Sequence, residues 1–485
     1  MSFVCGQDPA VAGDISEHQL GGKRETQPLR PQTIAVVPFQ NQSADLEQDY
    51  FCDGITDDII YALSRIPGLS VIGHATVFAL KGAAQDARAV GAKLGAGTVV
   101  DGTVRKSGNR LKIFAEMLDA VTGELQWTQT YERPIDDIFA VEAEIAEAVA
   151  RVLQMTLAPP VSRGLIRSAP NMDAYLLYLQ GRHAWNRMSA DGYRTAAEIL
   201  ERATSTFPSY ASAYAGLADA YMALALWGLA RPREAFPKAL QAAQQALRLD
   251  PSLPHAYSSL AAATTFYEWK WEEGVAYART ATEFEPSYSF GQHVYGSCLL
   301  VRGEMDEARE CFERAVDLDP LSVREHRSLG WMLYLARRFA RAEQWLQAAL
   351  VLDREPAETH SMLAQLYMSQ RRFGAALEQA ESCQTDPPDP VGLSVLGACL
   401  AYLNRREEAL KIAATLSQMA AAGYVESRAI AQLHIALGNT DQAIESVAKS
   451  LDEQEPFSAF LKLDPGFDPL RGDPRFGELV SRLGL

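Results

Sequence analysis

The chain has 485 residues, and its hydrophobic content of 48% excludes a wholly disordered protein. Lys and Arg total 45 against 61 Asp and Glu, and the resulting net charge of −16 argues against bulk binding to nucleic acid or anionic lipid. The longest uncharged run, residues 251–267, is too short and too rich in Ser, Thr and Tyr for a membrane-spanning helix.

Residues 1–32 are polar and have no long apolar core, so they predict a disordered arm rather than a signal peptide. The cysteines lie far apart and form no CxxC pair, a spacing that suits neither a disulfide framework nor a zinc site. We interpret them as reduced thiols and expect a cytoplasmic protein.

Residues 33–157 predict an α/β domain. Thr33–Phe39 is a β-rich run that ends at a proline and polar residues. A helix follows, for which Asp53 or Thr56 is the expected N-terminal cap, and Gly68 ends it.

A second strand is expected from Leu69, and a short helix over 86–94. Three strands joined by tight turns follow over 98–132, and such hairpins predict a mixed rather than an all-parallel sheet. A closing helix starts near Ile138, where apolar residues recur every three or four positions.

From about residue 171 the sequence is rich in Ala, Leu and Tyr at helical spacing. Leu329-Gly330, Leu363-Ala364 and Leu396-Gly397 recur at intervals of 34 and 33 residues, and an Ala follows each Gly or Ala by twelve positions. Small residues at these positions let two helices of a hairpin cross closely. The pattern resembles the tetratricopeptide repeat.

The repeat pattern predicts an all-α solenoid over 171–455 with about eight helical hairpins, clearest over 286–420. A solenoid of this kind usually presents a concave binding surface. Residues 456–485 contain three Asp-Pro steps and end in a short amphipathic stretch, which predicts a C-terminal capping segment over the last repeat.

The stretches YFCDGITDDII (50–60), IAVVPF (34–39) and VDGTVR (100–105) resemble the TolB-N-terminal-like domain of bacterial signalling proteins. The segment LRGDPRF (470–476) resembles the motif that ends such chains. The resemblance implies the C-terminal regulatory half of class III adenylate cyclases and CadC-like transcriptional regulators. Because only about 32 residues precede the first strand, we expect neither a cyclase nor a winged-helix domain.

No phosphate-binding glycine loop or nucleophile motif is present, so we expect no enzyme, no catalytic residue and no cofactor. The densest group of carboxylates is Asp53, Asp57 and Asp58. Helix capping explains all three, and a metal site is the alternative that requires them to converge.

Five positions on the first helix of each hairpin line the concave face of such repeats. The candidate partner-binding residues at these positions are Tyr175, Tyr178, Arg182, Trp185, Phe266, Tyr267, Phe290, His293, Arg324, Arg327, Trp331 and Tyr334. Aromatic and Arg side chains are typical of protein-binding hot spots, while packing between neighbouring helices is the alternative. Arg324 and Arg327, one turn apart, predict a grip on a carboxylate of the partner.

The sequence therefore predicts a non-enzymatic regulatory module of bacterial signal transduction that binds a protein or peptide in the concave groove. Two alternatives stay open. The chain could be the regulatory part of an adenylate cyclase or transcriptional-regulator system whose catalytic or DNA-binding domain is on another chain, or it could be a small-ligand sensor. No direct binding to nucleic acid is expected, and the oligomeric state is not predicted.

Overall fold

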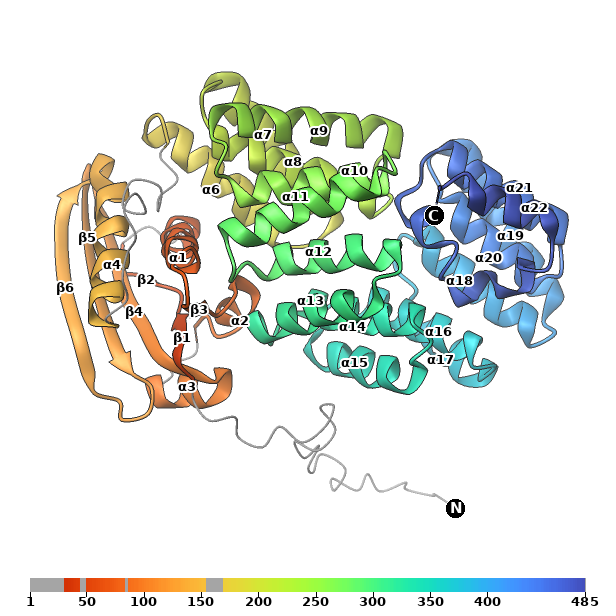
Figure 1. Ribbon diagram of the computed structural model, residues 1–485, viewed down its shortest axis with the longest axis horizontal. Coiled ribbons are helices and arrows are strands. Elements are labelled where there is room, and N and C mark those ends of the chain that lie inside the picture. The colour runs from red at the N-terminus through yellow and green to blue at the C-terminus, as the bar shows by residue number, and fades with distance from the viewer. Residues whose placement is uncertain (1–29, 44–48, 83–85, 154–168, 485) are drawn as a thin grey trace, which may run out of the picture.

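The computed structural model describes residues 30–43, 49–82, 86–153 and 169–484, and it shows an α/β domain followed by a helical solenoid (Figure 1). The predicted fold class is confirmed. Residues 1–29 of the predicted disordered arm lie outside the described residues. The other predicted domain boundaries stay predictions.

The α/β domain is built on one mixed sheet with strand order β3-β1-β4-β5-β6, and β2 pairs with β4. Strand β1 pairs in parallel with β3 and β4, whereas β4, β5 and β6 form an antiparallel meander. The strands are β1 (Arg30–Val36), β2 (Gln40–Asn41), β3 (Ser70–Val71), β4 (Ala96–Ser107), β5 (Arg110–Asp119) and β6 (Leu125–Pro134).

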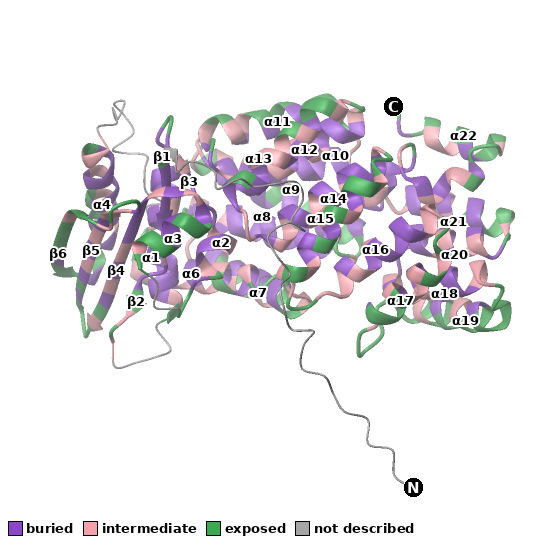
Figure 2. Ribbon diagram, turned by 90° about the horizontal axis from the view of Figure 1, so that it is seen from below, coloured by how far each residue is buried: buried purple, intermediate pink, exposed green. Residues whose placement is uncertain are grey.

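Helices cover both faces of this sheet. Helices α1 (Asp49–Ser64) and α4 (Ile138–Val152) share one apolar core with strand β5. Every second side chain over most of β5 is buried in this core, beginning with Leu111 and Ile113. Helices α2 (His74–Phe78) and α3 (Ala87–Leu94) pack on the opposite face in a separate cluster. The outer strand β6 is mostly exposed (Figure 2).

The solenoid consists, within the described residues, of eight antiparallel helix pairs. The pairs are α6 (Met172–Asn186) and α7 (Ala190–Thr206), α8 (Ala211–Leu226) and α9 (Pro232–Leu249), α10 (Pro254–Phe266) and α11 (Trp271–Phe284), α12 (Ser289–Arg302) and α13 (Met305–Leu318), α14 (Val323–Leu335) and α15 (Phe339–Leu352), α16 (Ala357–Ser369) and α17 (Phe373–Ser382), α18 (Pro390–Tyr402) and α19 (Arg406–Ala422), and α20 (Ser427–Ala436) and α21 (Thr440–Asp452).

The small residues of the repeat pattern lie where the paired helices cross. A Cβ atom added to Gly181 would lie 2.6 Å from Cγ of Leu200, and one added to Gly330 would lie 2.8 Å from Cγ of Leu346. Side chains at these two positions would therefore push α6 from α7 and α14 from α15.

Residues 456–484, here called the C-terminal segment, contain η3 (Pro456–Phe460), η4 (Pro465–Leu470) and α22 (Pro474–Ser481). Helix α22 packs on α21, and its role as a cap over the last repeat stays a prediction. The segment also reaches the middle of the solenoid, where Phe460 packs against Phe266 and the Trp271 indole donates a hydrogen bond to the Leu483 carbonyl at 3.0 Å. Helix α10 is consequently buried on almost every side (Figure 2).

Candidate functional site

A cleft of about 1020 Å³ lies between the α/β domain and the concave side of the repeats. One wall comes from helices α1 and α2, and the other comes from α6 and from the segments that begin α12, α14 and α16. Figure 1 shows α2 beside the solenoid helices α12 and α13. The cleft is therefore formed only when the two domains are docked.

Backbone hydrogen bonds fix helix α2 against the solenoid. The Gly73 amide donates to the Leu318 carbonyl at 2.7 Å, and the Thr76 amide donates to the Asp319 carboxylate at 2.7 Å. The Leu321 amide in turn donates to the Thr76 hydroxyl at 2.8 Å. Asp319 and Thr76 are both buried, so each of these bonds satisfies a polar group that is shielded from water.

Helix α1 is anchored to the solenoid at two further points. The Ser64 hydroxyl donates to the Glu285 carboxylate at 2.6 Å. The Tyr175 hydroxyl of α6 donates to Asp58 at 2.6 Å and contacts Glu142 of α4 at 3.1 Å. Three elements thus meet at one fully buried phenol, and burial raises the pKa of Tyr175 well above its ordinary value.

Six of the twelve predicted groove residues line this cleft. They come from the first, fourth and fifth repeats and are Tyr178, Arg182, Trp185, Phe290, Arg324 and Arg327. The structure brings them together because the helices that carry them share one side of the solenoid. The aromatic and Arg character predicted for the groove is present in the cleft lining.

Each predicted arginine pairs with a carboxylate of its own chain. The pairs are Arg182 with Asp219 at 3.0 Å, Arg324 with Glu325 at 2.9 Å, and Arg327 with Glu358 at 2.5 Å. The guanidiniums of Arg182 and Arg324 also lie over the rings of Trp185 and Phe290, at 4.8 and 4.6 Å from the centroids. Binding of a partner carboxylate by Arg324 and Arg327 stays a prediction, and it would compete with these internal pairs.

Three carboxylates in or next to the cleft lining have different electrostatic environments: Asp319 and Glu325 are buried, and Glu358 is half-buried. Burial alone would raise the pKa of Glu325, but the charge of Arg324 and the hydrogen bond from His293 lower it to about 2. Burial raises the pKa of Glu358 and of Asp319. The cleft lining therefore contains two carboxylates that are easier to protonate, Asp319 and Glu358, beside the firmly ionised Glu325 that is buried behind it.

The other six predicted residues do not line the cleft. Tyr175 lies under the α/β domain, and His293 bonds to buried Glu325 at 3.1 Å. The remaining four lie toward neighbouring helices and the C-terminal segment: Phe266 against Phe460, Tyr267 stacked on Phe236, and Trp331 stacked on Tyr334, whose hydroxyl donates to Asp464 at 3.0 Å. The contacts of these six side chains are contacts with other parts of the same chain, which is the alternative to partner binding that the sequence leaves open.

Several cleft residues were missed because they belong to the α/β domain or to turns between repeats. His74 lies 2.5 Å from Asp57 and stacks on Phe78 in the domain wall. Arg187 and Asp386 come from turns of the solenoid. The repeat frame marks helix positions only, so nothing in the sequence pattern points to these residues.

The carboxylates considered for a metal site point to different partners, and the expected capping of α1 by Asp53 or Thr56 is wrong because this helix begins at Asp49. Asp53 pairs with Lys81 at 2.6 Å, Asp57 lies beside His74, and Asp58 accepts from Tyr175. Over 30–43, 49–82, 86–153 and 169–484, no group of three or more His, Cys, Asp or Glu side chains is placed to hold a metal ion. No helix in those same ranges has the length and apolar character needed to span a membrane.

Curated relatives match part of the chain, and two of them are described here. A putative adenylate cyclase 3 from Rhizobium meliloti is 37% identical over 242 residues, which cover 49% of this chain and 41% of the relative. The transcriptional regulator HilA from Salmonella typhimurium is 24% identical over 164 residues, or 34% of this chain and 30% of the regulator. The chain thus spans less than half the length of these curated relatives.

Among solved structures, a human IFIT1 dimer with m7Gppp-AAAA aligns with 71% of this chain and 77% of its own, at 17% identity and a TM-score of 0.48. A thermophilic tetratricopeptide-repeat protein of Thermus thermophilus covers 35% of this chain and 92% of its own, at 24% identity and a TM-score of 0.32. Residues 296–359 match the tetratricopeptide repeat family model. The matched residues run from α12 to the start of α16, so the family match covers the middle of the helical part of the chain.

Proposed function

We propose that the chain is a non-enzymatic regulatory module of bacterial signal transduction, and that the cleft between its two domains binds a segment of a protein partner. The observation that carries this proposal is the cleft itself, about 1020 Å³ in volume and lined by aromatic and charged side chains from both domains. Such a volume is at the upper end of small-molecule pockets and suits an extended peptide. The TolB-like assignment of 33–157 and a cytoplasmic location belong to this proposal.

The charge of the cleft favours a basic segment as the ligand. Eight Asp and Glu residues line it against five Arg, and three of those arginines already pair with carboxylates. Glu355 and Asp386 are exposed at its edge, and no ion pair involves either of them within the described residues. Lys or Arg side chains of a partner would find unneutralised carboxylates there.

Affinity capture from the native cells tests the proposal. The bait is the full chain, and the cleft variant carries Glu355→Lys together with Asp386→Lys. A matched control carries Glu407→Lys and Glu478→Lys, two exposed carboxylates outside the cleft. We expect one stoichiometric protein to be captured by the wild type and by the control and to be lost with the cleft variant.

Retention of the same protein by the cleft variant would place binding elsewhere on the chain. Thermal unfolding of all three proteins checks that the substitutions leave the fold intact. Exposed positions away from packed contacts usually tolerate substitution within about 0.5 kcal/mol.

A second candidate function is supported by the relatives named above. We propose as the alternative that the chain regulates an adenylate cyclase or a transcriptional regulator whose catalytic or DNA-binding domain is on another chain. The support is the 37% identity to a putative adenylate cyclase. Identification of a cyclase or a DNA-binding protein in the captured material would favour it over an unrelated partner.

A further inference from the structure

The sheet of the α/β domain ends in two strands, β3 and β6, and its two edges are protected very differently. Strand β3 has two residues and lies against the solenoid, where the Val71 amide donates to the Ser287 hydroxyl at 3.4 Å. Arg314 of the solenoid also donates to the Ser70 hydroxyl at 3.2 Å. Strand β6 has ten residues and lies on the side of the sheet that faces away from the solenoid (Figure 1). Within the described residues, the β6 edge is therefore the one left open to a further strand.

The backbone of β6 turns hydrogen-bonding groups toward this open edge. The Ile135 amide donates to the Asn109 carbonyl at 3.0 Å, which fixes the phase of the ladder with β5. Bonded and non-bonded pairs alternate in an antiparallel ladder, so the amides and carbonyls of Thr128 and Thr130 point away from β5. Neither amide has a hydrogen-bond partner among the residues that the structure describes. Pro134, which lacks an amide hydrogen, holds an outward position of the same kind.

The side chains of β6 do not protect this edge. Proteins usually guard an open edge with a charged side chain, most often Lys, or with a proline within the strand. Residues 125–131 (LQWTQTY) contain neither. Leu125 at the start of β6 and Val121 in the turn before it are large apolar side chains that are 54% and 59% exposed. Because the whole chain carries a net charge of −16, this uncharged stretch is a place where two copies approach with little repulsion.

We propose that the chain forms a homodimer in which two β6 strands pair antiparallel about a twofold axis at Gln129. Thr128 of each copy then lies opposite Thr130 of the other, and the outward amides of all four threonines find carbonyl acceptors. Trp127 lies opposite Tyr131 of the second copy. Both aromatic side chains belong to or pack on the core that α4 covers, so the pairing extends this apolar layer from one copy to the next. Aromatic and Thr–Thr pairs across strands are favourable.

The charges at the two ends of β6 select this register. With the axis at Gln129, Glu132 lies opposite Gln126, and the other charged residues near the strand ends also face uncharged ones. An axis at Thr128 would place Glu132 opposite Glu124, and like charges directly opposite each other are destabilising. An axis shifted the other way, to the next threonine, would separate the aromatic pairs.

Sedimentation velocity of the full chain over concentrations from about 1 to about 200 µM tests the proposal. We expect the mass to rise from that of one chain toward that of two, since a small interface of this kind supports association in the micromolar range. Strand β6 contributes no residue to the lining of the large cleft, so dimerisation is measured independently of partner binding there.

Two double variants at the same positions form a matched pair. Thr128→Lys with Thr130→Lys places like charges opposite each other across the dimer and should stay monomeric over the whole range. Thr128→Lys with Thr130→Glu places opposite charges together and should dimerise at least as tightly as the wild type. Both positions are exposed, so both variants should keep the wild-type unfolding temperature.

Three results would overturn the proposal. A wild type that keeps the mass of one chain at about 200 µM would exclude the dimer and leave this edge to a strand of another protein. A dimer that persists in the Lys–Lys variant would place the interface elsewhere on the chain. Loss of the dimer in the Lys–Glu variant, with a normal unfolding curve, would contradict the axis at Gln129.

Discussion

The carboxylate of Asp319 accepts a hydrogen bond from the Thr76 amide at 2.7 Å, across 243 positions of sequence. Asp319 ends a repeat of the solenoid, and Thr76 lies in the first turn of α2 in the α/β domain. No side chain from the N-terminal region of α2 itself caps that helix. Its cap is instead Asp319, a residue of the other domain. The wall of the large cleft depends on this contact.

Gly73→Ala should weaken the docking of the two domains. A Cβ atom at Gly73 would lie 2.6 Å from Cγ of Asp319, so that side chain would have to move and lose its hydrogen bond to Thr76. The backbone φ of −70° at Gly73 suits alanine, so the effect comes from the close approach alone. We expect the free energy of unfolding in urea to fall by about 1–3 kcal/mol.

Gly374→Ala is the matched control for that substitution. Gly374 lies in α17, and a Cβ atom there would meet nothing within 4 Å. Helix propensity predicts a gain of up to about 1 kcal/mol at this position. Equal effects of the two substitutions would show that the Gly73 contact does not hold the domains together.

Tyr175→Phe should destabilise the chain without altering the cleft lining. The substitution removes the hydroxyl that bonds to Asp58 and Glu142, and both carboxylates are buried. We expect a loss of about 1–3 kcal/mol in the free energy of unfolding. In the matched variant Tyr277→Phe the hydroxyl has no hydrogen bond within the described residues, and an equal loss there would contradict the argument.

The repeat architecture could be predicted because its signal is local. Small residues such as Gly330 recur at a fixed period and allow helix crossing within one hairpin. The same frame placed Tyr175 and Phe266 on the concave side. The α/β domain covers Tyr175, and the C-terminal segment covers Phe266. Both arrangements depend on contacts between residues that are far apart in the sequence.

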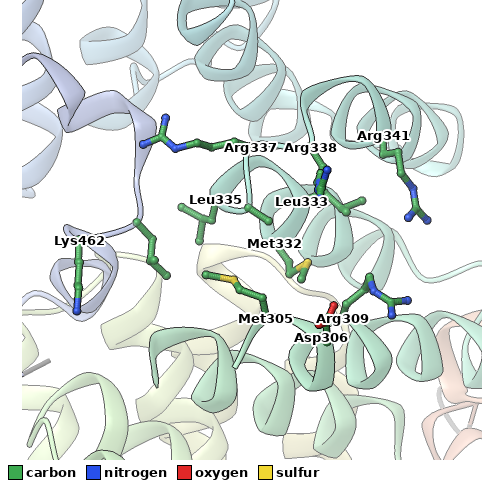
Figure 3. A pocket seen from close by; sticks show the side chains of 12 residues that line it. Met305, Asp306, Arg309, Met332, Leu333, Leu335, Arg337, Arg338, Arg341 and Lys462 are labelled. Carbon is green, nitrogen blue, oxygen red and sulfur yellow. The ribbon is translucent and has the colours of Figure 1, made fainter. Parts of the chain in front are cut away.

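The pairing of the groove arginines could not be predicted for a different reason. The repeat pattern indicates which face of α14 carries Arg327. It does not indicate the rotamer of Glu358 on the next hairpin, and the Glu358 carboxylate is the one that forms an ion pair with Arg327. The cavity of about 560 Å³ between the end of α14 and the C-terminal segment (Figure 3) could not be predicted either, because Lys462 and Leu463 reach the repeats only through the path of that segment. Periodicity indicates which face of a helix is buried, but it does not indicate which residues pack against that face.

The stability of the chain should fall in acid partly through Glu325. Its pKa of about 2 in the folded protein lies below the ordinary value of 4.5, because Arg324 and His293 outweigh the opposing effect of burial. Between these values the unfolded chain binds a proton that the folded chain does not, so stability is lost as the pH falls from about 4.5 to 2. The maximum contribution is on the order of 3 kcal/mol.

Urea unfolding between pH 5 and pH 3 measures this contribution. Glu325→Gln should be less stable than the wild type at pH 5, because Arg324 loses its partner, and should show a shallower dependence on pH. Glu407→Gln, at an exposed site, should keep the wild-type slope. An unchanged slope in the Glu325 variant would mean that other carboxylates account for the acid sensitivity.

Glu455 should produce the opposite dependence near neutral pH. Burial, followed by the nearby charge of Glu426, raises its pKa from 4.5 to about 7, although the amides of Ser427 and Arg428 donate to it at 2.6 and 3.0 Å. Between pH 4.5 and 7 the folded chain holds a proton that the unfolded chain has released. Stability from this group is therefore full below pH 4.5 and is lost as the pH rises through 7.

Replacing Glu455 by Gln removes the titration while keeping the size of the side chain. The wild type should lose up to about 3 kcal/mol from this group between pH 4.5 and pH 8, and Glu455→Gln should lose correspondingly less. Because Glu455 anchors the start of α20 just before the C-terminal segment, the same change should appear in hydrogen exchange of the Ser427 and Arg428 amides. Parallel stability curves for the two proteins would show that Glu455 is ionised throughout this range.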